Sequence, residues 1–421
     1  MNLAKRYHEH MKNKQSVSKK LLLSFCFLLI AVSGFAQWTG VGSGTTKSLK
    51  SVHFPTHDIG YTVGALGTII KSNYYGISWT TQTSGTTKDL YSVFFISSDT
   101  GYVVGDNGTI LKTTDGGTTW TTQISNTTYN LRSVYFTDAD TGYVVGSYGT
   151  ILKTCDGGNN WIIQTSGTND PLRSVYFFSV PGYTNMGYAV GGYMGSTATI
   201  LKTINSGTTW TALTSGVSDL LQSVYFTDIN TGYAAGGHTP YCPVIIKTTD
   251  GGISWVTQSI EVGTQINSVF FINADTGFVV TENNPIFSTV NGGAYWKQEQ
   301  ILGLFRSIYF TNADSGYVVG DLGQIYRTTT GGIFIEETQL PQFEISIFPN
   351  PFSTSTTIQT SINLKSATLS IYNALGQEIK TMQNISGKQI ILQRDNLAEG
   401  IYFIRLKEDN KIIATEKLMI N

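Results

Sequence analysis

Charge is scarce in this sequence of 421 residues. Lys, Arg, Asp and Glu together make up 13% of it, and the formal net charge is −1. Proteins that bind nucleic acid through bulk electrostatics need a strongly basic surface, so we expect no nucleic-acid partner. The chain is also 12% aromatic, which indicates a buried core and excludes intrinsic disorder.

Cysteines and helix-forming patterns are scarce too. The three cysteines show no Cys/His spacing of a zinc site, and no phosphate loop or metal-binding helix is present, so we expect neither a metal nor a cofactor. No amphipathic helix pattern follows residue 40. The 45 glycines, with abundant Thr and Ser, instead favour short strands joined by tight turns, which predicts an all-β fold.

Residues 1–36 have the pattern of an export signal peptide. Two lysines precede the apolar run LLLSFCFLLIAV, and SGFAQ offers a small-residue cleavage site after Ala36. The apolar run is too short and too near the start to favour a permanent anchor, so we expect no transmembrane anchor in a mature chain that begins at Gln37. Since the segment before the lysines is long, translation could start at Met1 or at Met11.

The chain then repeats itself with a period of roughly 40 residues. Each unit opens on S-V/I-x-F and continues through D-T-G-Y-V-V-G, G-T-I-L-K-T and D-G-G-x-x-W. Four strand-length apolar segments separated by turns within this length are typical of one propeller blade. The opening signature begins at Ser51, Ser92, Ser133, Ser174, Ser223, Ser268 and Ser307.

The seven tryptophans indicate how the ring of blades closes. Each opens the fourth strand of a unit, but the unit that begins at Ser307 has none, and Trp38 has no unit before it. We therefore expect the Trp38 strand to complete the blade begun at Ser307, so that the first and last blades share a sheet and hide its edges. This predicts a seven-bladed β-propeller over residues 37–334.

The repeat D-x-G-Y-x-V-G-x-x-G-T-I-L-K-T-x-D-G-G-x-x-W resembles that of the photosystem II stability and assembly factor family over nearly all of residues 38–334. It also contains the Asp-box, or BNR-type, motif S/T-x-D-x-G-x-x-W of sialidase-like propellers. The first resemblance implies a protein-binding propeller that helps to assemble a membrane protein complex, and the second implies a glycoside hydrolase. Because one fold hosts many functions, function must be argued from a site.

After Phe334 the repeat stops. Residues 335–342 read as a linker, and the alternation in TLSIY and IYFIRL predicts a small Ig-like β-sandwich over residues 343–421. This tail resembles the type A sorting domain of the type IX secretion system. The residues that carry the match are Pro349, Asn350, Pro351, Asn373, Gly376, Gly400, Tyr402 and Lys417.

The resemblance of the tail implies that the type IX secretion machinery is a partner of the protein. It also implies export, to the outer-membrane surface or beyond the cell. Whether the tail is removed, and whether the protein is then anchored or released, stays open.

The acids of the repeat have a structural interpretation. Asp115, Asp156 and Asp250 precede two glycines in the turn before the fourth strand. A tight turn needs a short side chain that bonds nearby amides and a residue that tolerates positive φ. We therefore expect these aspartates to hold the scaffold rather than to serve catalysis or calcium binding.

The position just before the first strand of each unit is the main candidate site. This strand is the innermost of a blade, so residues there should ring the mouth of the central channel. The position holds Lys50, Tyr91, Arg132, Arg173, Gln222, Asn267 and Arg306. Four of these are basic, and together they would bind an anionic or carboxylate-bearing ligand. The alternative is that each basic side chain pairs with a local acid.

Blades four and five carry longer loops on the same face as the channel mouth. Loop variation on a rigid scaffold is where binding usually occurs, and exposed aromatic residues suit contact surfaces. We expect these loops to contribute contacts, with drift without function as the alternative. The candidate residues are Tyr193, Met194, His238 and Tyr241.

A glycosidase would need two carboxylates that flank one bond. Glu282 and Asp321 lie in loops of adjacent blades, but no Tyr/Glu pair and no F/Y-R-I-P segment of a sialidase is present. We therefore expect an exported propeller that binds a protein or glycan ligand non-covalently. A glycan-cleaving enzyme and an assembly factor are the alternatives.

Overall fold

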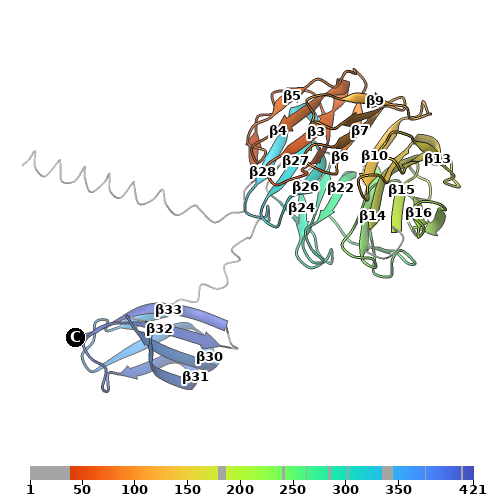
Figure 1. The fold of residues 1–421 in the computed structure, drawn as a ribbon. Coiled ribbons are helices and arrows are strands. Elements are labelled where there is room, and N and C mark those ends of the chain that lie inside the picture. The colour runs from red at the N-terminus through yellow and green to blue at the C-terminus, as the bar shows by residue number, and fades with distance from the viewer. Residues whose placement is uncertain are drawn as a thin grey trace, which may run out of the picture. The chain divides into compact units, whose positions relative to one another are not determined.

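The computed structural model describes residues 38–178, 186–238, 242–261, 263–282, 286–299, 301, 303–333, 345–374, 376–408 and 411–421. The chain divides into two compact units, one that ends at Phe334 and one that begins at Ile335. Figure 1 shows both units, and each is described by itself below. The predicted signal peptide and the predicted linker lie outside the described residues.

The first unit is a ring of sheets. Over its described residues it forms seven sheets, each of four antiparallel strands, which we call strands A to D of a blade from the channel outwards. The A strands of neighbouring blades contact one another all around the ring, so they line the channel. The seven-bladed propeller predicted from the sequence is confirmed.

The strands of the seven blades follow one another along the chain. Blades one and two are β2 (Leu49–His53), β3 (Gly60–Gly64), β4 (Ile69–Ser72), β5 (Thr80–Gln82), and β6 (Leu90–Phe95), β7 (Gly101–Gly105), β8 (Ile110–Thr113), β9 (Thr121–Gln123). Blades three and four are β10 (Leu131–Phe136), β11 (Gly142–Gly146), β12 (Ile151–Thr154), β13 (Ile162–Gln164), and β14 (Leu172–Phe178), β15 (Met186–Gly191), β16 (Thr199–Thr203), β17 (Thr211–Thr214). Blades five and six are β18 (Leu221–Phe226), β19 (Gly232–His238), β20 (Cys242–Thr248), β21 (Val256–Thr257), and β22 (Ile266–Phe271), β23 (Gly277–Thr281), β24 (Phe287–Thr289), β25 (Lys297–Gln298). Blade seven is β26 (Phe305–Phe310), β27 (Gly316–Gly320), β28 (Ile325–Thr328) and β1 (Thr39–Val41).

Strand β1 closes the ring, as the tryptophan pattern predicts. It pairs antiparallel with β28, with Val41 opposite Ile325. The indole Nε1 of Trp38 donates a hydrogen bond to the carbonyl oxygen of Gly332 at 3.0 Å. The indole also packs edge-on against Phe310, with ring centroids 5.9 Å apart. The two ends of the propeller are thus joined by a sheet rather than by a covalent link.

Burial follows the position of a strand in its blade. In blade three, all of β11 is buried, β10 alternates between buried and partly buried, and β13 is mostly exposed. Strand B is covered by neighbouring blades on both faces, which explains the continuous apolar run GYVVG. The glycine that opens this run is required by close packing, since a Cβ on Gly142 would lie 2.5 Å from the ring of Phe136.

The repeated serine links each blade to the next. Strand A is the inner edge of its sheet, so alternate amides would have no partner within the blade. The Val175 amide donates instead to Ser133 Oγ of the preceding blade at 3.2 Å. The same bond joins Val93 to Ser51, and Val52 of the first blade to Ser307 of the last. The opening signature of the repeat therefore encodes contacts between blades.

The Asp-box is a hydrogen-bonded turn, and side chains of the preceding blade donate hydrogen bonds to it. Asp115 Oδ1 accepts from the Thr119 amide at 2.9 Å, and Oδ2 accepts from the Thr119 hydroxyl at 2.6 Å. These bonds to Thr119 lower the pKa of Asp115 to about 2. From blade one, the Tyr61 hydroxyl and Lys71 Nζ both donate to the Gly116 carbonyl, at 2.9 and 2.8 Å. The aspartate has the scaffold role expected from its repetition.

A ring of aromatic side chains occupies the channel. They are the third residues of the seven opening signatures, and neighbouring ring centroids lie 4.8 to 5.5 Å apart around the complete circle. Such spacing is typical of favourable aromatic pairs. The ring consists of His53, Phe94, Tyr135, Tyr176, Tyr225, Phe270 and Tyr309.

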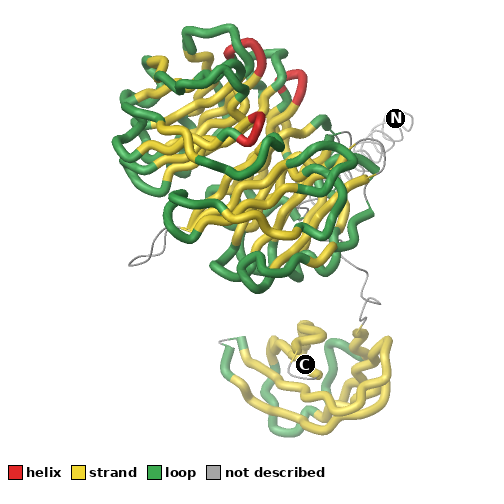
Figure 2. Tube along the Cα trace, turned by 90° about the vertical axis from the view of Figure 1, so that its right-hand side faces the viewer, coloured by secondary structure: helices red, strands yellow, loops and turns green. Residues whose placement is uncertain are grey.

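Three short 3₁₀ turns join strand B to strand C in blades one, three and seven. They are η1 (Ala65–Gly67), η2 (Ser147–Gly149) and η3 (Asp321–Gly323), drawn red in Figure 2. The central residue of each has a left-handed backbone, with φ of 55° at Leu66 and Tyr148 and 57° at Leu322. Residues other than glycine and asparagine rarely adopt this conformation.

The second unit is a small β-domain with its own core. Its strands are β29 (Ile345–Phe348), β30 (Ser355–Asn373), β31 (Glu378–Gln393), β32 (Gly400–Glu408) and β33 (Lys411–Ile420). β29 pairs with the first part of β30 and β32 with its last part, while β31 follows its other edge. The register of β30 with β31 shifts between these parts, and a buried cluster that includes Ile358, Leu369 and Ile404 fills the domain. The predicted small β-sandwich is confirmed.

Candidate functional site

The residues predicted to ring the channel mouth share one backbone feature. In blade three, Leu131 pairs with Gly146 and Ser133 with Val145, so Arg132 is an extra residue opposite strand B. The same register shift occurs at this position in every other blade. A β-bulge of this kind re-aims a side chain. The ring residues therefore lie within strand A rather than just before it. Their side chains do not follow the alternating directions of the other side chains of the strand.

All seven bulge residues line one cavity at the channel mouth, which we call the ring cavity. Its volume is about 380 Å³. Asp321, Ser48 and Gln265 complete the wall. The structure therefore brings together the four predicted basic residues, Lys50, Arg132, Arg173 and Arg306.

Two of the four basic residues are paired with acids. Lys50 Nζ lies 2.7 Å from Asp89 Oδ2, and this hydrogen bond lowers the pKa of Asp89 below its usual range. Arg306 bonds Asp321 through two nitrogens, at 2.6 and 3.2 Å, and reaches Glu282 Oε1 at 3.3 Å. For these two residues the alternative of a local acid partner is the one that the structure shows.

The other two basic residues are arginines without an acid partner among the described residues. Arg132 lies over the ring of Tyr91, 4.0 Å from its centroid, and the Tyr91 hydroxyl donates to Asp106 at 2.8 Å. Arg173 is partly buried, and its Nε is buried without a hydrogen-bond partner. Burial, and then the charge of Arg132, lower the pKa of Arg173. The wall of the ring cavity therefore carries two guanidinium groups without a direct acid partner among the described residues, and Asp89 acts on Arg132 only through longer-range attraction.

The aromatic ring lies deeper in the channel than the basic residues. His53 follows Lys50 by three positions on the same strand, and the other blades repeat this spacing. None of the seven residues of the aromatic ring lines the ring cavity, whose aromatic lining residue is Tyr91. The sequence signal for the aromatic ring was present, since the third position of S-V/I-x-F is aromatic in every unit, but its closure into a circle is seen only in the structure.

The residues predicted in the long loops lie apart from the ring cavity. Tyr193 and Met194 are exposed, with 48% and 67% of their surfaces accessible, in the connection between β15 and β16. His238 ends β19 and forms a hydrogen bond with the buried carboxylate of Asp219. Tyr241 lies outside the described residues. None of the three described residues lines the ring cavity.

The two carboxylates considered for a glycosidase are held by one arginine. Arg306 bonds both Glu282 and Asp321. Burial alone would raise the pKa of Asp321, but hydrogen bonds from Arg306 and Ser48 lower it below its usual range. A general acid needs a raised pKa, so Asp321 as it is held here is not suited to that role. In the described part of the chain, no cluster of three His, Cys, Asp or Glu is placed to hold a metal ion.

The matched residues of the tail come together at one end of the domain. Asn350 donates from Nδ2 to the Lys417 carbonyl at 2.9 Å and accepts from the Met419 amide at 2.8 Å. Asn373 lies opposite Tyr402 in the pairing of β30 with β32. Gly376, in the turn that follows, has φ of +79° and donates to the Asn373 carbonyl at 3.0 Å. Residues far apart in the sequence thus fix the C-terminal strand in place.

The remaining matched residues also belong to this end. Pro349 accepts a hydrogen bond at its carbonyl from the Thr356 hydroxyl at 2.6 Å, and Pro351 follows two residues later. Gly400 begins β32 opposite Ile420. Across the described residues of the whole chain, no helix has the length and apolar character needed to cross a membrane.

Solved structures with the same fold include two of YCF48. The structure described as YCF48 bound to D1 peptide has 20% identity and a TM-score of 0.59, and the match covers 71% of this chain and 98% of that one. YCF48 from Cyanidioschyzon merolae has 18% identity and a TM-score of 0.56, with 70% and 99% covered. At these identities the likeness shows the fold alone.

A third solved structure comes from a secretion system. PorZ, described as an essential bacterial surface component of the type IX secretion system of Porphyromonas gingivalis, has 11% identity and a TM-score of 0.53. The match covers 90% of this chain and 60% of that one, so this chain spans well under the full length of PorZ. No curated protein sequence matches the chain.

Two family models match the sequence. The model of the secretion system C-terminal sorting domain matches residues 346–421, which indicates the type IX secretion machinery as a partner and points to export. The model of the photosynthesis system II assembly factor YCF48 matches residues 30–125, 120–218 and 205–332. The chain therefore belongs to the YCF48 assembly factor family and carries a type IX sorting tail.

Proposed function

We propose that the propeller is an exported, non-covalent binding module that takes a carboxylate-bearing peptide into the ring cavity. The observation that carries this proposal is the pair of arginines without acid partners, Arg132 and Arg173, on the wall of one cavity. A guanidinium binds a carboxylate through two parallel hydrogen bonds, which gives both strength and direction. A partly buried guanidinium with a free N–H favours such a ligand because it leaves a donor to satisfy.

The shape of the cavity favours a chain end or a single acidic side chain over a flat protein surface. The cavity measures about 380 Å³ and lies above a ring of aromatic side chains. One carboxylate with the residue that carries it can enter such a space, with apolar atoms toward Tyr91. A solved YCF48 structure is described as bound to a D1 peptide, which supports peptide recognition by this fold. Recognition of a peptide is the step that this chain would share with the assembly role of its family.

The proposal is tested with peptides that differ only at the C-terminus. A library of heptapeptides with free carboxylates and its matched library of C-terminal amides are offered to the mature chain. We expect preference for the free carboxylate or for internal Asp and Glu. Arg132→Gln with Arg173→Gln should weaken binding by a factor of ten or more, because a charged hydrogen bond contributes about 1.5–3 kcal/mol. Glutamine fits these positions of the ring cavity, since Gln222 occupies the equivalent position in blade five.

The control removes the same amount of charge elsewhere on the same face. Lys47 and Lys88 are exposed in the loops that precede blades one and two, outside the ring cavity. Lys47→Gln with Lys88→Gln should leave the affinity unchanged at physiological salt. Equal affinity of the arginine variant and the wild type would contradict the proposal, as would equal binding of acid and amide libraries.

The export route forms the second part of the proposal. Residues 1–36 direct the chain across the inner membrane, and residues 343–421, joined by the linker 335–342, direct it across the outer membrane to the cell surface or the medium. The match of the tail to the sorting domain supports this route. Deletion of residues 343–421 should leave the propeller inside the outer membrane with Gln37 at its N-terminus. Surface exposure of the truncated chain would contradict the role of the tail.

A further inference from the structure

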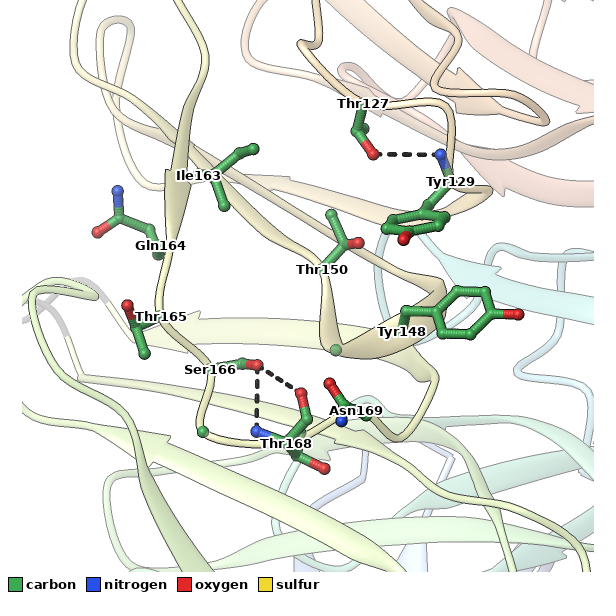
Figure 3. Close-up of a pocket in the computed structure, with 12 residues that line it drawn as sticks. Thr127, Tyr129, Tyr148, Thr150, Ile163, Gln164, Thr165, Ser166, Thr168 and Asn169 are labelled. Carbon is green, nitrogen blue, oxygen red and sulfur yellow. Dashed lines mark hydrogen bonds between the residues drawn. The ribbon is translucent and has the colours of Figure 1, made fainter.

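Blade three carries an exposed pair of tyrosines on the same face as the ring cavity. Tyr129 lies in the loop between β9 and β10, and Tyr148 is the central residue of η2. Their ring centroids are 4.7 Å apart, with an angle of 36° between the planes, and the two rings lie together in Figure 3. Although packed on each other, Tyr129 remains 47% exposed and Tyr148 61% exposed.

The pair is a departure from the repeat. The position of Tyr129 is held by Lys47 before blade one and by Lys88 before blade two. The position of Tyr148 is held by Leu66, Asn107 and Leu322 in blades one, two and seven. Because the scaffold forms with other residues at both positions, the fold does not require a tyrosine at either.

The two tyrosines stand beside a cleft of about 560 Å³. This volume lies within the range of roughly 300–1,000 Å³ for small-molecule sites. Apart from the tyrosines, Ile163 and two glycines, every lining side chain carries a hydroxyl or an amide, and no lining residue is charged. The other lining side chains are Thr127, Thr150, Gln164, Thr165, Ser166, Thr168 and Asn169.

The loops that form this cleft are held by hydrogen bonds to backbone groups. The Gly108 amide donates to the Tyr129 carbonyl at 2.9 Å, and the Tyr129 amide donates to Thr127 Oγ1 at 3.1 Å. Asn126 Nδ2 from the same loop donates to the Trp161 carbonyl of blade three at 3.2 Å. The loops of the cleft are thus held in place without a ligand. This favours affinity, because binding then costs little conformational entropy.

Several polar groups of the cleft remain available. Within the described structure, no partner is found for the hydroxyls of Tyr129, Tyr148 and Thr165 or for the side-chain amide of Asn169. These groups can donate and accept hydrogen bonds. They surround exposed aromatic faces in a region without charge, which is the combination that a neutral, hydroxyl-rich ligand with one apolar face would need.

We infer that this cleft binds a neutral oligosaccharide. A pyranose ring has an apolar face of C–H groups that packs on an aromatic ring, and hydroxyls at its edge that bond amides and hydroxyls. The stacked pair offers the aromatic face, and Thr165 and Asn169 offer the polar partners. An anionic sugar is disfavoured because the lining contains no cation.

Comparison with the equivalent cleft of blade one shows which features of the proposed site belong to the scaffold. It measures about 690 Å³ and is lined by the same Thr, Ser, Gln and Gly positions, with Leu66 and Lys88 but no aromatic side chain. The groove itself is therefore a property of the repeat. The tyrosines are the aromatic residues that distinguish blade three, which also has Ile163 and Asn169 where blade one has Thr81 and Thr87. The left-handed backbone alone does not, since Leu66 and Tyr148 both have φ of 55°.

The test uses uncharged tetrasaccharides as probes: cellotetraose, chitotetraose and mannotetraose. Binding to the mature chain is measured by saturation-transfer NMR and by titration calorimetry, with millimolar affinity expected for at least one sugar. Tyr129→Lys with Tyr148→Asn gives blade three the residues of blade two, where Asn107 has φ of 54°. This variant should fold with an unchanged melting temperature and bind the sugar at least about ten-fold more weakly.

Two controls make the outcome decisive. Leu66→Asn changes the equivalent turn of blade one and should leave sugar binding unchanged. Arg132→Gln with Arg173→Gln should also leave it unchanged, because those residues line the ring cavity and not this cleft. Binding of none of the three sugars would overturn the inference, and so would equal affinity of the tyrosine variant. Binding of hexaproline at the tyrosines in place of the sugars would assign the cleft to a proline-rich peptide instead.

Discussion

Replacement of His53 by phenylalanine should remove a large part of the acid sensitivity of the propeller. His53 is the single imidazole in the aromatic ring, at the position that Phe94 and Phe270 hold in blades two and six. Its Nδ1 accepts a hydrogen bond from the Phe95 amide at 3.3 Å, so protonation at that nitrogen would break the bond. The rings of Phe94 and Tyr309 lie 4.8 and 5.0 Å from it.

The size of the effect follows from the pKa of His53. Burial lowers this pKa from 6.5 to about 4 in the folded protein. Above pH 6.5 the imidazole is neutral in both states, so it contributes no pH dependence there. As the pH falls from 6.5 toward 4, the unfolded chain binds a proton that the folded chain excludes, and the free energy of unfolding decreases. At pH 4.5 the full shift corresponds to about 2.5 kcal/mol, and partial access of water reduces this to about 2 kcal/mol.

The measurement is urea unfolding of wild type and His53→Phe at pH 7.5 and pH 4.5. Tryptophan fluorescence reports the propeller specifically, because all seven tryptophans lie between Trp38 and Trp296. Carboxylates also lose stabilising bonds in acid, so the relevant quantity is the difference between the two proteins. The neighbouring Tyr309 does not titrate in this range, since burial raises its pKa to about 12. Equal losses in both proteins, within about 0.5 kcal/mol, would refute the reasoning.

Three further predictions test the ring closure, the Asp-box and the tail. Trp38→Ala should lower the free energy of unfolding of the propeller by about 3–5 kcal/mol in urea, through loss of packing and of the bond to Gly332. Asp115→Asn should leave the melting temperature unchanged while Asp115→Ala lowers it, because Asn205 makes the same turn bond in blade four at 2.9 Å; equal effects would contradict the scaffold role. Asn350→Ala should lower the stability of the tail by about 1–2 kcal/mol in calorimetry, since two hydrogen bonds to β33 are lost.

The architecture could be predicted from the sequence because each blade repeats the same strand pattern and the same residues that join it to its neighbours. The period of the signatures, the apolar strand-B runs and the displaced Trp38 determine the number of blades and the closure by β1. The ring of basic residues was also predictable, since the innermost strand must line the channel. Its exact place was not: the bulge at Arg132 depends on how strand A pairs with strand B, and no residue type marks it.

Pairing within the ring cavity could not be predicted from the sequence. Lys50 and Arg132 occupy equivalent positions, yet only Lys50 reaches an acid, because Asp89 precedes the next strand A on the side that faces it. Pro171 holds the equivalent position ahead of strand A of blade four, so Arg132 has no such carboxylate and lies on Tyr91 instead. The choice between the two interpretations therefore depended on one residue per blade, in a loop whose geometry the sequence does not give.

The comparison between blades separates structural residues from candidate functional ones within a single chain. Residues that recur in nearly every blade have structural partners: Ser133 bonds the next strand A, Lys71 and Tyr61 bond the next Asp-box, and Asp115 bonds its own turn. Each bond would have to be replaced if the residue changed, which explains the repetition. Tyr148 of blade three and Arg173 of the ring have no such bond, although the same fold forms with asparagine or glutamine in their places. Substitution of these two residues should therefore change ligand binding and leave the stability of the ring unaffected.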